Sequence, residues 1–89
     1  MQNIMASGSV RLNARFWSGE NLKMNKHKLS QQGQISYPTV LKYLNTPSDV
    51  LAFDGGVLYT ILVDGMGYSP EDAMKLNLGD VFEFVPEAS

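Results

Sequence analysis

The chain contains no cysteine, one histidine and no long apolar run. Without cysteine it cannot form a disulfide, a thiolate metal site or a cysteine nucleophile, which fits a reducing cytosol. His27 alone cannot supply the several ligands that a bound metal ion requires. No stretch reaches the roughly eighteen apolar residues of a membrane-spanning helix, and Met1–Ser9 lacks the basic start and apolar core of a signal peptide. We therefore expect a soluble, cytoplasmic protein that binds neither a metal nor a membrane.

Groups for catalysis are equally scarce. No nucleophile stands beside a base and an orienting partner, and Gly55–Gly56 is not followed by the lysine and hydroxyl residue of a phosphate-binding loop. The 89 residues suffice for one small domain, which we place at residues 10–89, after a flexible segment at residues 1–9. This length leaves no room for a separate catalytic or effector-binding domain. We predict a protein that is not an enzyme and has no cofactor.

Charge is distributed unevenly along the chain. Residues 1–46 carry six lysine or arginine side chains and one carboxylate, whereas residues 47–89 carry one lysine and eight carboxylates. The formal net charge of −2 disfavours nucleic acid as a partner, because phosphate neutralisation supplies much of the affinity of DNA-binding proteins. The basic residues 1–46, taken alone, favour nucleic acid as a partner. Whether the two halves stay apart or intermix on folding is left open by the sequence.

The segment Ser36–Leu44 predicts a short amphipathic helix. Its serine is a suitable cap, and Pro38 suits the first helical turn, where an N–H group has no partner within the helix. Val40, Leu41 and Leu44 then fall on one side. The remaining side chains form a compact polar face with no evident structural duty.

A second helical segment, Asn25–Gly33, lies just upstream. Asn25 is a plausible cap, and Leu29 is the main apolar anchor of a turn that is otherwise basic. Only Gln34 and Ile35 separate this segment from the capped helix that follows. Two short helices joined in this way are typical of a helix-turn-helix motif.

Two groups of residues carry a family resemblance. The first is the set Leu29, Ser30, Ile35, Ser36, Pro38, Thr39 and Val40, and the second is the tail Leu78-Gly-Asp-Val-Phe-Glu-Phe-Val-Pro86. With these residues, Met24–Tyr43 resembles the helix-turn-helix of the XRE family of small regulators, the lambda Cro and cI repressor class, and the tail resembles the ending of its single-domain members. Gln34 stands where that family usually has glycine, and Gly33 lies one position earlier.

The resemblance implies an all-α fold of four or five helices, to which a short C-terminal strand can be added. It further implies a sequence-specific DNA-binding transcriptional regulator that reads the major groove of double-stranded DNA with the helix Ser36–Leu44. The resemblance places Tyr37, Thr39 and Lys42 at positions that reach base edges, and Ser36 begins this reading helix. At the start of the preceding helix, Lys26 and Lys28 lie beside free N–H groups and are expected to hold a phosphate. Arg11 and Arg15 are candidate contacts to the DNA backbone.

Two other segments can be interpreted in more than one way. Val10–Trp17 alternates with the period of a strand, yet the resemblance favours a first helix there; as a strand it could pair within an α+β fold, Val10–Phe16 against Val81–Val85. At Val50–Val63, Asp54-Gly-Gly indicates a hairpin, but Asp54 can also cap a helix that ends at Gly65, and the resemblance favours the helix. Ser69 and the proline after it predict a further helix within Tyr68–Asn77.

A domain this small reads few base pairs, so we expect a homodimer on two half-sites, with the apolar segment Val81–Val85 as one candidate interface. Aromatic residues chiefly serve cores, which predicts packing roles for Trp17 and Tyr43. The alternative function is a protein-binding module, antitoxin-like or a regulatory adaptor, that keeps the repressor-like fold. It would bind a protein partner through its acidic C-terminal half, and the net charge and Gln34 favour it.

Overall fold

A side-chain cap begins each of the four main helices in the computed structural model, which describes residues 8–86. The Asn25 side chain accepts from the N–H of Lys28 at 2.8 Å, and the Asp54 carboxylate accepts from two N–H groups. Ser36 and Ser69 cap in the same manner. All four caps were predicted, since a cap is a local interaction between a side chain and the backbone two or three residues further on.

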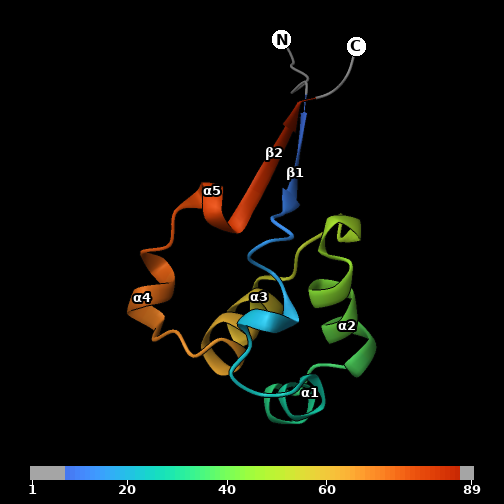
Figure 1. Ribbon diagram of the computed structural model, residues 1–89, viewed down its shortest axis with the longest axis vertical. Helices are drawn as coiled ribbons and strands as arrows, with labels where there is room; N and C mark the ends of the chain where they lie inside the picture. Colours follow the sequence, from blue (N-terminus) through green and yellow to red (C-terminus); the bar gives the residue numbers. More distant parts are fainter. Residues whose placement is uncertain (1–7, 87–89) are drawn as a thin grey trace.

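The structure is mostly helical with a small two-stranded antiparallel sheet (Figure 1). No described helix combines the length and the hydropathy that crossing a bilayer would require. The elements are, in order, β1 (Gly8–Leu12), the 3₁₀ turn η1 (Gly19–Asn21), α1 (Lys26–Gly33), α2 (Tyr37–Asn45), the 3₁₀ turn η2 (Pro47–Asp49), α3 (Gly55–Thr60), the π-helical turn η3 (Ile61–Gly65), α4 (Pro70–Met74), α5 (Leu78–Val81) and β2 (Phe82–Pro86).

The predicted helical domain with a short C-terminal strand is present, and the sheet adds a second strand to it. β1 and β2 pair along their whole length, from Gly8 opposite Pro86 to Leu12 opposite Phe82. The first helix expected at Val10–Trp17 is therefore wrong, and the alternative strand is present but ends at Leu12 instead of Phe16. Gly8 and Ser9, which the sequence assigned to a flexible segment, belong to β1, while the rest of that segment lies outside the described residues.

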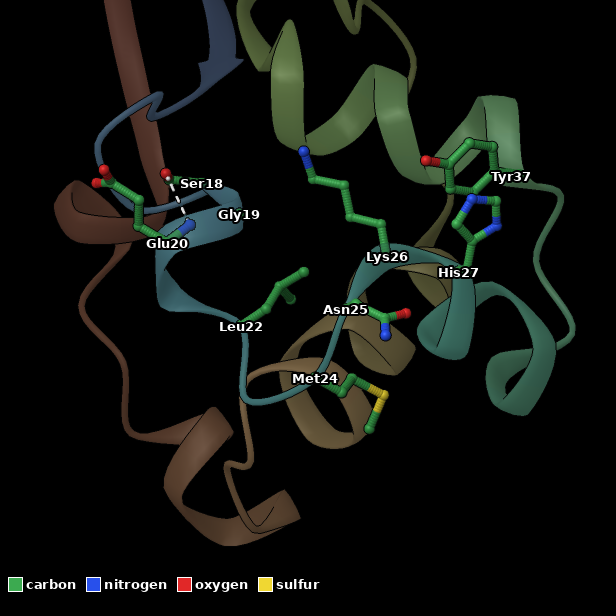
Figure 2. Close-up of a pocket in the computed structure, with 9 residues that line it drawn as sticks. All are labelled: Ser18, Gly19, Glu20, Leu22, Met24, Asn25, Lys26, His27 and Tyr37. Carbon is green, nitrogen blue, oxygen red and sulfur yellow. Dashed lines mark hydrogen bonds between the residues drawn. The ribbon is translucent and has the colours of Figure 1, made fainter.

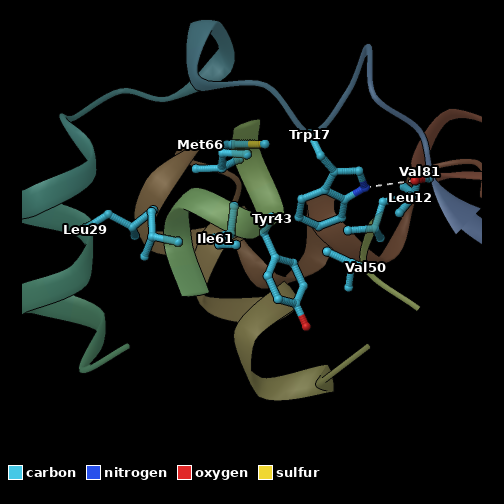
Figure 3. Packing of buried hydrophobic residues seen from close by; sticks show 10 residues of the cluster. Leu12, Trp17, Leu29, Tyr43, Val50, Ile61, Met66 and Val81 are labelled. Carbon is cyan, nitrogen blue, oxygen red and sulfur yellow. Dashed lines mark hydrogen bonds between the residues drawn. The ribbon is translucent and has the colours of Figure 1, made fainter. Parts of the chain in front are cut away.

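A turn after β1 leads directly into the core. The Trp17 side chain is completely buried, and its indole N–H donates to the backbone carbonyl of Val81 at 2.8 Å (Figure 3). The Asn13 N–H donates to the same carbonyl at 3.0 Å. The strand β1 and the turn from Asn13 to Trp17 that follows it take the place of the helix. The packing role predicted for Trp17 is confirmed.

The middle segment is helical, so the hairpin alternative at Val50–Val63 is wrong. Asp54 starts α3, which continues into η3 and stops at Gly65 as predicted. Ile61 is completely buried, and Leu58 and Leu62 pack partly buried against the core. A side chain at Gly65 would lie 2.9 Å from a methyl carbon of Leu22, which shows how closely this turn approaches its neighbours.

The remaining helices are short. The helix predicted within Tyr68–Asn77 is α4, which begins after Ser69 as expected but ends at Met74. α5 follows and leads directly into β2. The core combines side chains from residues 12 to 82, and it extends from Leu29 of α1 to Val81 at the base of the sheet (Figure 3). The molecule is elongated, with extents of 45 × 28 × 22 Å, because the sheet projects from the helices (Figure 1).

Candidate nucleic-acid interface

The two helices of the predicted motif are present and joined by a tight turn. Gln34 has a φ of 56°, the left-handed conformation, and ends α1 by donating its N–H to the carbonyl of Ser30. The Ile35 N–H donates to the same carbonyl at 3.1 Å. Gln34 thus takes the backbone conformation that glycine adopts most readily, and it is the only described residue other than glycine with a positive φ.

Glycine is needed one position earlier for a different reason. A Cβ atom at Gly33 would lie 2.4 Å from the Cγ2 methyl of Thr60 in α3. The absence of a side chain therefore lets the end of α1 lie directly against α3. This turn thus has two separate requirements on successive residues: the close approach of α3 falls on Gly33, and the left-handed backbone falls on Gln34.

Burial separates α2 into two faces. Val40 and Leu44 are 0% and 5% exposed, and Leu41 is half-buried, so the predicted apolar side faces the core. Tyr43 is also buried, as predicted, and its hydroxyl accepts the N–H of Asp54 at 3.0 Å. The outward face carries Pro38, Lys42 and Asn45, which are all exposed.

Two neighbouring residues of α1 hold the two ends of α2. Lys26 donates from its Nζ to the side-chain oxygen of Asn45, the last residue of α2. His27 stacks on Tyr37, the first residue of α2, with ring centroids 4.0 Å apart and an interplanar angle of 6° (Figure 2). Of the predicted contact residues, Lys26 and Tyr37 therefore already have partners within the protein. His27 and Asn45 were not among the predicted site residues.

The hydroxyl groups at the start of α2 also interact. The Ser36 and Thr39 side-chain oxygens lie 2.7 Å apart, and the Ser36 oxygen accepts the Thr39 N–H at 3.4 Å. Ser36 therefore has a structural role as the helix cap. The Thr39 side chain is half-buried. Lys28 and Lys42 are exposed.

The two predicted arginines lie elsewhere. Arg11 is on β1, directly opposite Glu83 of β2, and β1 and α1 lie at opposite ends of the long axis (Figure 1). Arg15 is exposed and borders a surface hollow together with Asp80. The structure thus brings Lys26, Lys28, Ser36, Tyr37, Thr39 and Lys42 together on α1 and α2, and it places Arg11 and Arg15 apart from them.

An open pocket of about 730 Å³ lies between η1 and the first turns of α1 and α2 (Figure 2). It has apolar side chains from Leu22 and Met24 and polar or aromatic ones from Lys26, His27 and Tyr37. Within residues 8–86, no three histidine or acidic side chains are grouped so that they could share a metal ion. Comparison with protein-family models, with curated proteins and with solved structures finds no match to this chain.

Proposed function

We propose that the protein is a sequence-specific DNA-binding transcriptional regulator that reads the major groove with the helix Ser36–Leu44. One observation carries this proposal: α1 and α2 form a tight pair whose apolar side chains are buried and whose outward side is polar. Such a pair needs no further covering, and a helix of this size fits the major groove. The proposal includes a cytoplasmic location, where chromosomal or phage DNA is accessible.

The charge of the pair supports an anionic partner. Residues 25–45 contain three lysines and no carboxylate, although the whole chain has a net charge of −2. The formal charges within α1, α2 and the turn between them are therefore all positive. Lys28, with Lys26 beside it at the beginning of α1, is suited to a phosphate, because the helix N-terminus adds its own partial positive charge.

Base reading is assigned to the outward face of α2. Lys42 is exposed and can donate to guanine O6 or N7, and the Thr39 methyl group can contact a thymine methyl. Tyr37 is limited to a contact by its ring edge or hydroxyl, because His27 covers one of its faces. Ser36 starts the helix, and Arg11 and Arg15 are assigned to the phosphate backbone outside the half-site that α2 reads.

A homodimer is the second part of the proposal. Val10 and Phe84 face each other on one side of the sheet and are 40% and 60% exposed. The sheet has only two strands, so each strand also has an edge whose backbone groups are unpaired within the sheet. Pairing of two strand edges about a two-fold axis would satisfy the unpaired backbone groups and bring the two exposed apolar faces side by side, and such a dimer would offer two copies of α2 to one duplex.

The test is a selection of bound sequences from a random duplex pool, carried out at moderate and at high salt. We expect enrichment of a short two-fold symmetric motif, with half-sites about one helical turn apart, and weaker retention at high salt. Retention of no duplex at any salt concentration would contradict the proposal.

The Lys42→Ala variant distinguishes base reading from electrostatic attraction to the DNA phosphates. We expect this variant to lose about 1–3 kcal/mol of discrimination at one base pair, because a base contact disappears. Lys28→Ala is the matched phosphate variant, expected to weaken binding to all sequences alike and to lower the slope of log K against log salt by about one. Lys75→Ala, in α4's flanking turn, should leave both properties unchanged. Unaltered base preference in Lys42→Ala would contradict its assignment.

The alternative, a protein-binding module, rests on a different surface. Met74 and Leu78 are 87% and 64% exposed, and the carboxylates Glu71, Asp72 and Asp80 lie before and after them in the chain. A basic, partly apolar protein would fit this surface. Capture of a protein partner without any selected duplex would favour this function over DNA binding.

A further inference from the structure

Asn45 is the last residue of α2 and shares its outward side with the predicted base reader Lys42. Pro38, Lys42 and Asn45 follow one another at spacings of four and three residues, which places them in one stripe along the helix. All three are exposed, and the completely buried Val40 lies on the opposite side of the helix. A duplex that contacts Lys42 would therefore also meet the Asn45 side chain.

The side-chain amide of Asn45 has a defined orientation. Lys26 donates from its Nζ to the amide oxygen. An ammonium group has donors only, so the amide atom that faces it must be the oxygen, and the amide N–H groups lie on the other side. Among residues 8–86 the structure gives these N–H groups no hydrogen-bond partner, and the residue is exposed. Asn45 therefore presents free donors, while its acceptor is already bonded to Lys26.

Close packing holds the Lys26 ammonium at this oxygen. A Cβ atom at Gly19 would lie 2.9 Å from the Lys26 Cε and 3.3 Å from its Nζ, so the end of this side chain lies directly against η1. Lys26 is also half-buried. Figure 2 shows its side chain extending from α1 toward α2. The ammonium is therefore confined between η1 and the end of α2.

We propose that Asn45 is a further base-reading residue and that its bond to Lys26 restricts it to guanine, an inference that rests on the proposed function. Guanine presents two acceptors in the major groove, O6 and N7, and both suit the amide N–H groups. Adenine presents an N6 amino group beside N7, and the oxygen of an asparagine normally accepts from that group. Here the oxygen already accepts from Lys26, so the amino group would meet the ammonium, donor against donor. Adenine is therefore disfavoured.

The donors of Lys42 and Asn45 together predict the composition of the half-site. Lys42 can donate to guanine, and Asn45 lies three residues further along the same helix. Side chains at this spacing on a helix in the major groove contact successive base pairs in zinc fingers. Each half-site should therefore contain two neighbouring G·C base pairs, one for each side chain. Lys26 acts on the second of these through Asn45 and is a positioning residue there.

The experiment compares the duplexes selected by the protein and its variants and measures their dissociation constants by fluorescence anisotropy. For the unaltered protein we expect neighbouring G·C pairs in each half-site. Asn45→Ala should lose about tenfold of the guanine preference at one base pair, next to the pair affected in Lys42→Ala. An unchanged preference in Asn45→Ala would overturn the reading role. Enrichment of a symmetric motif without neighbouring G·C pairs would overturn this inference and leave the proposed function standing, whereas retention of no duplex would overturn both.

Lys26→Met tests the restriction to guanine. Methionine keeps most of the apolar stem and removes the ammonium, so the Asn45 oxygen becomes free to accept from adenine. We expect the preference for guanine over adenine at this base pair to fall by about tenfold. Lys26→Arg, which restores a donor, should keep the preference. Retained discrimination against adenine in Lys26→Met would overturn the restriction.

Gly19→Ala disturbs the same contact from a residue that is not assigned to DNA. The added methyl group displaces the end of the Lys26 side chain, which is flexible, so circular dichroism should show unchanged helix content. We expect this variant to lose guanine preference at the Asn45 base pair, as Lys26→Met does. Gly79→Ala is the matched control, because nothing lies within 4 Å of a Cβ atom there, and it should keep the preference. Equal base preferences in the two glycine variants would overturn the positioning role of Lys26.

Discussion

The α1–α2 pair and the β1–β2 sheet bury their apolar side chains to very different degrees. In the helical pair, Leu29 and Val40 are completely buried and only polar or half-covered groups face outwards. In the sheet, burial depends on position along the strands. Leu12, at the base, is 1% exposed, whereas Val10 and Phe84, further out on the same face, are 40% and 60% exposed.

This difference indicates which surface each region offers. The helices are packed fully by their own chain, so what remains on them is a polar face suited to a charged partner. The outer half of the sheet extends beyond the core that could cover it. An isolated two-stranded sheet is marginally stable in water, and exposed apolar groups beside unpaired strand edges favour association with another chain. The proposed recognition of DNA therefore fits the helices, and the proposed association fits the sheet.

The largest expected effect comes from breaking the packing of the helical pair. Leu29→Ala removes the completely buried anchor of α1 and leaves a cavity against Ile61 and the surrounding core. We expect the free energy of unfolding to fall by about 2–5 kcal/mol. Urea unfolding followed by circular dichroism measures it. Leu51→Ala is the matched control, because Leu51 is 82% exposed; its effect should stay within about 0.5 kcal/mol. A similar loss in both variants would contradict this account of the core.

A smaller loss should follow from separating α1 and α3. Gly33→Ala places a methyl group 2.4 Å from the Thr60 Cγ2 atom, so one helix must shift. We expect a loss of about 1–3 kcal/mol in the free energy of unfolding. Thr60→Ser removes Cγ2 and keeps the hydroxyl group, so adding it to Gly33→Ala should recover most of this loss. A double variant as unstable as Gly33→Ala would show that the conflict lies elsewhere.

The turn itself offers a stabilising change. Gln34→Gly removes the steric cost of a left-handed backbone, which exceeds the extra entropy that glycine has in the unfolded chain. We expect a gain of about 0.5–1 kcal/mol in the free energy of unfolding. Gln34→Val should lose stability, because a β-branched side chain tolerates a positive φ poorly. A loss on substitution by glycine would mean that the Gln34 side chain contributes more than its backbone strain costs.

The smallest effect on stability, with the largest effect on association, is expected in the sheet. Phe84→Ser replaces an exposed apolar side chain, so the unfolding free energy of the monomer should change by less than about 0.5 kcal/mol. Sedimentation velocity should show a dimer for the unaltered protein and a monomer for this variant. Tyr59→Ser, at a comparably exposed aromatic residue of α3, should leave the dimer intact. A dimer in Phe84→Ser would assign association to another surface.

The sequence predicted the helices well wherever a local interaction decides them. The caps at Asn25, Ser36, Asp54 and Ser69 act over two or three residues, so their neighbours alone specify them. No such local interaction distinguishes the strand β1 from a helix. Its partner is β2, far along the chain, and Val10–Phe16 fits both periods over such a short length. The pairing with β2 decided between them.

The candidate site followed the same pattern. Lys42 could be placed on the outward face of α2 by helical spacing alone. The partners of Lys26 and Tyr37 could not be predicted from helical spacing, because each contact joins one helix to the other. Asn45 of α2 accepts from Lys26 of α1, and His27 of α1 stacks on Tyr37 of α2. Arg11 was grouped with the other basic residues by its position in the chain, and only the sheet register shows that it lies opposite Glu83.

Trp17 also gives the protein a built-in optical reporter of folding. It is the sole tryptophan, and its indole N–H bonds to a carbonyl 64 residues away, at the base of β2. Helices form from nearby residues and quickly, whereas bringing such distant segments together must first close a long loop. Indole emission therefore follows the docking of β1 and β2, while far-ultraviolet ellipticity follows the helices. In a stopped-flow experiment, indole emission would report when the sheet docks, and ellipticity would report separately when the helices form.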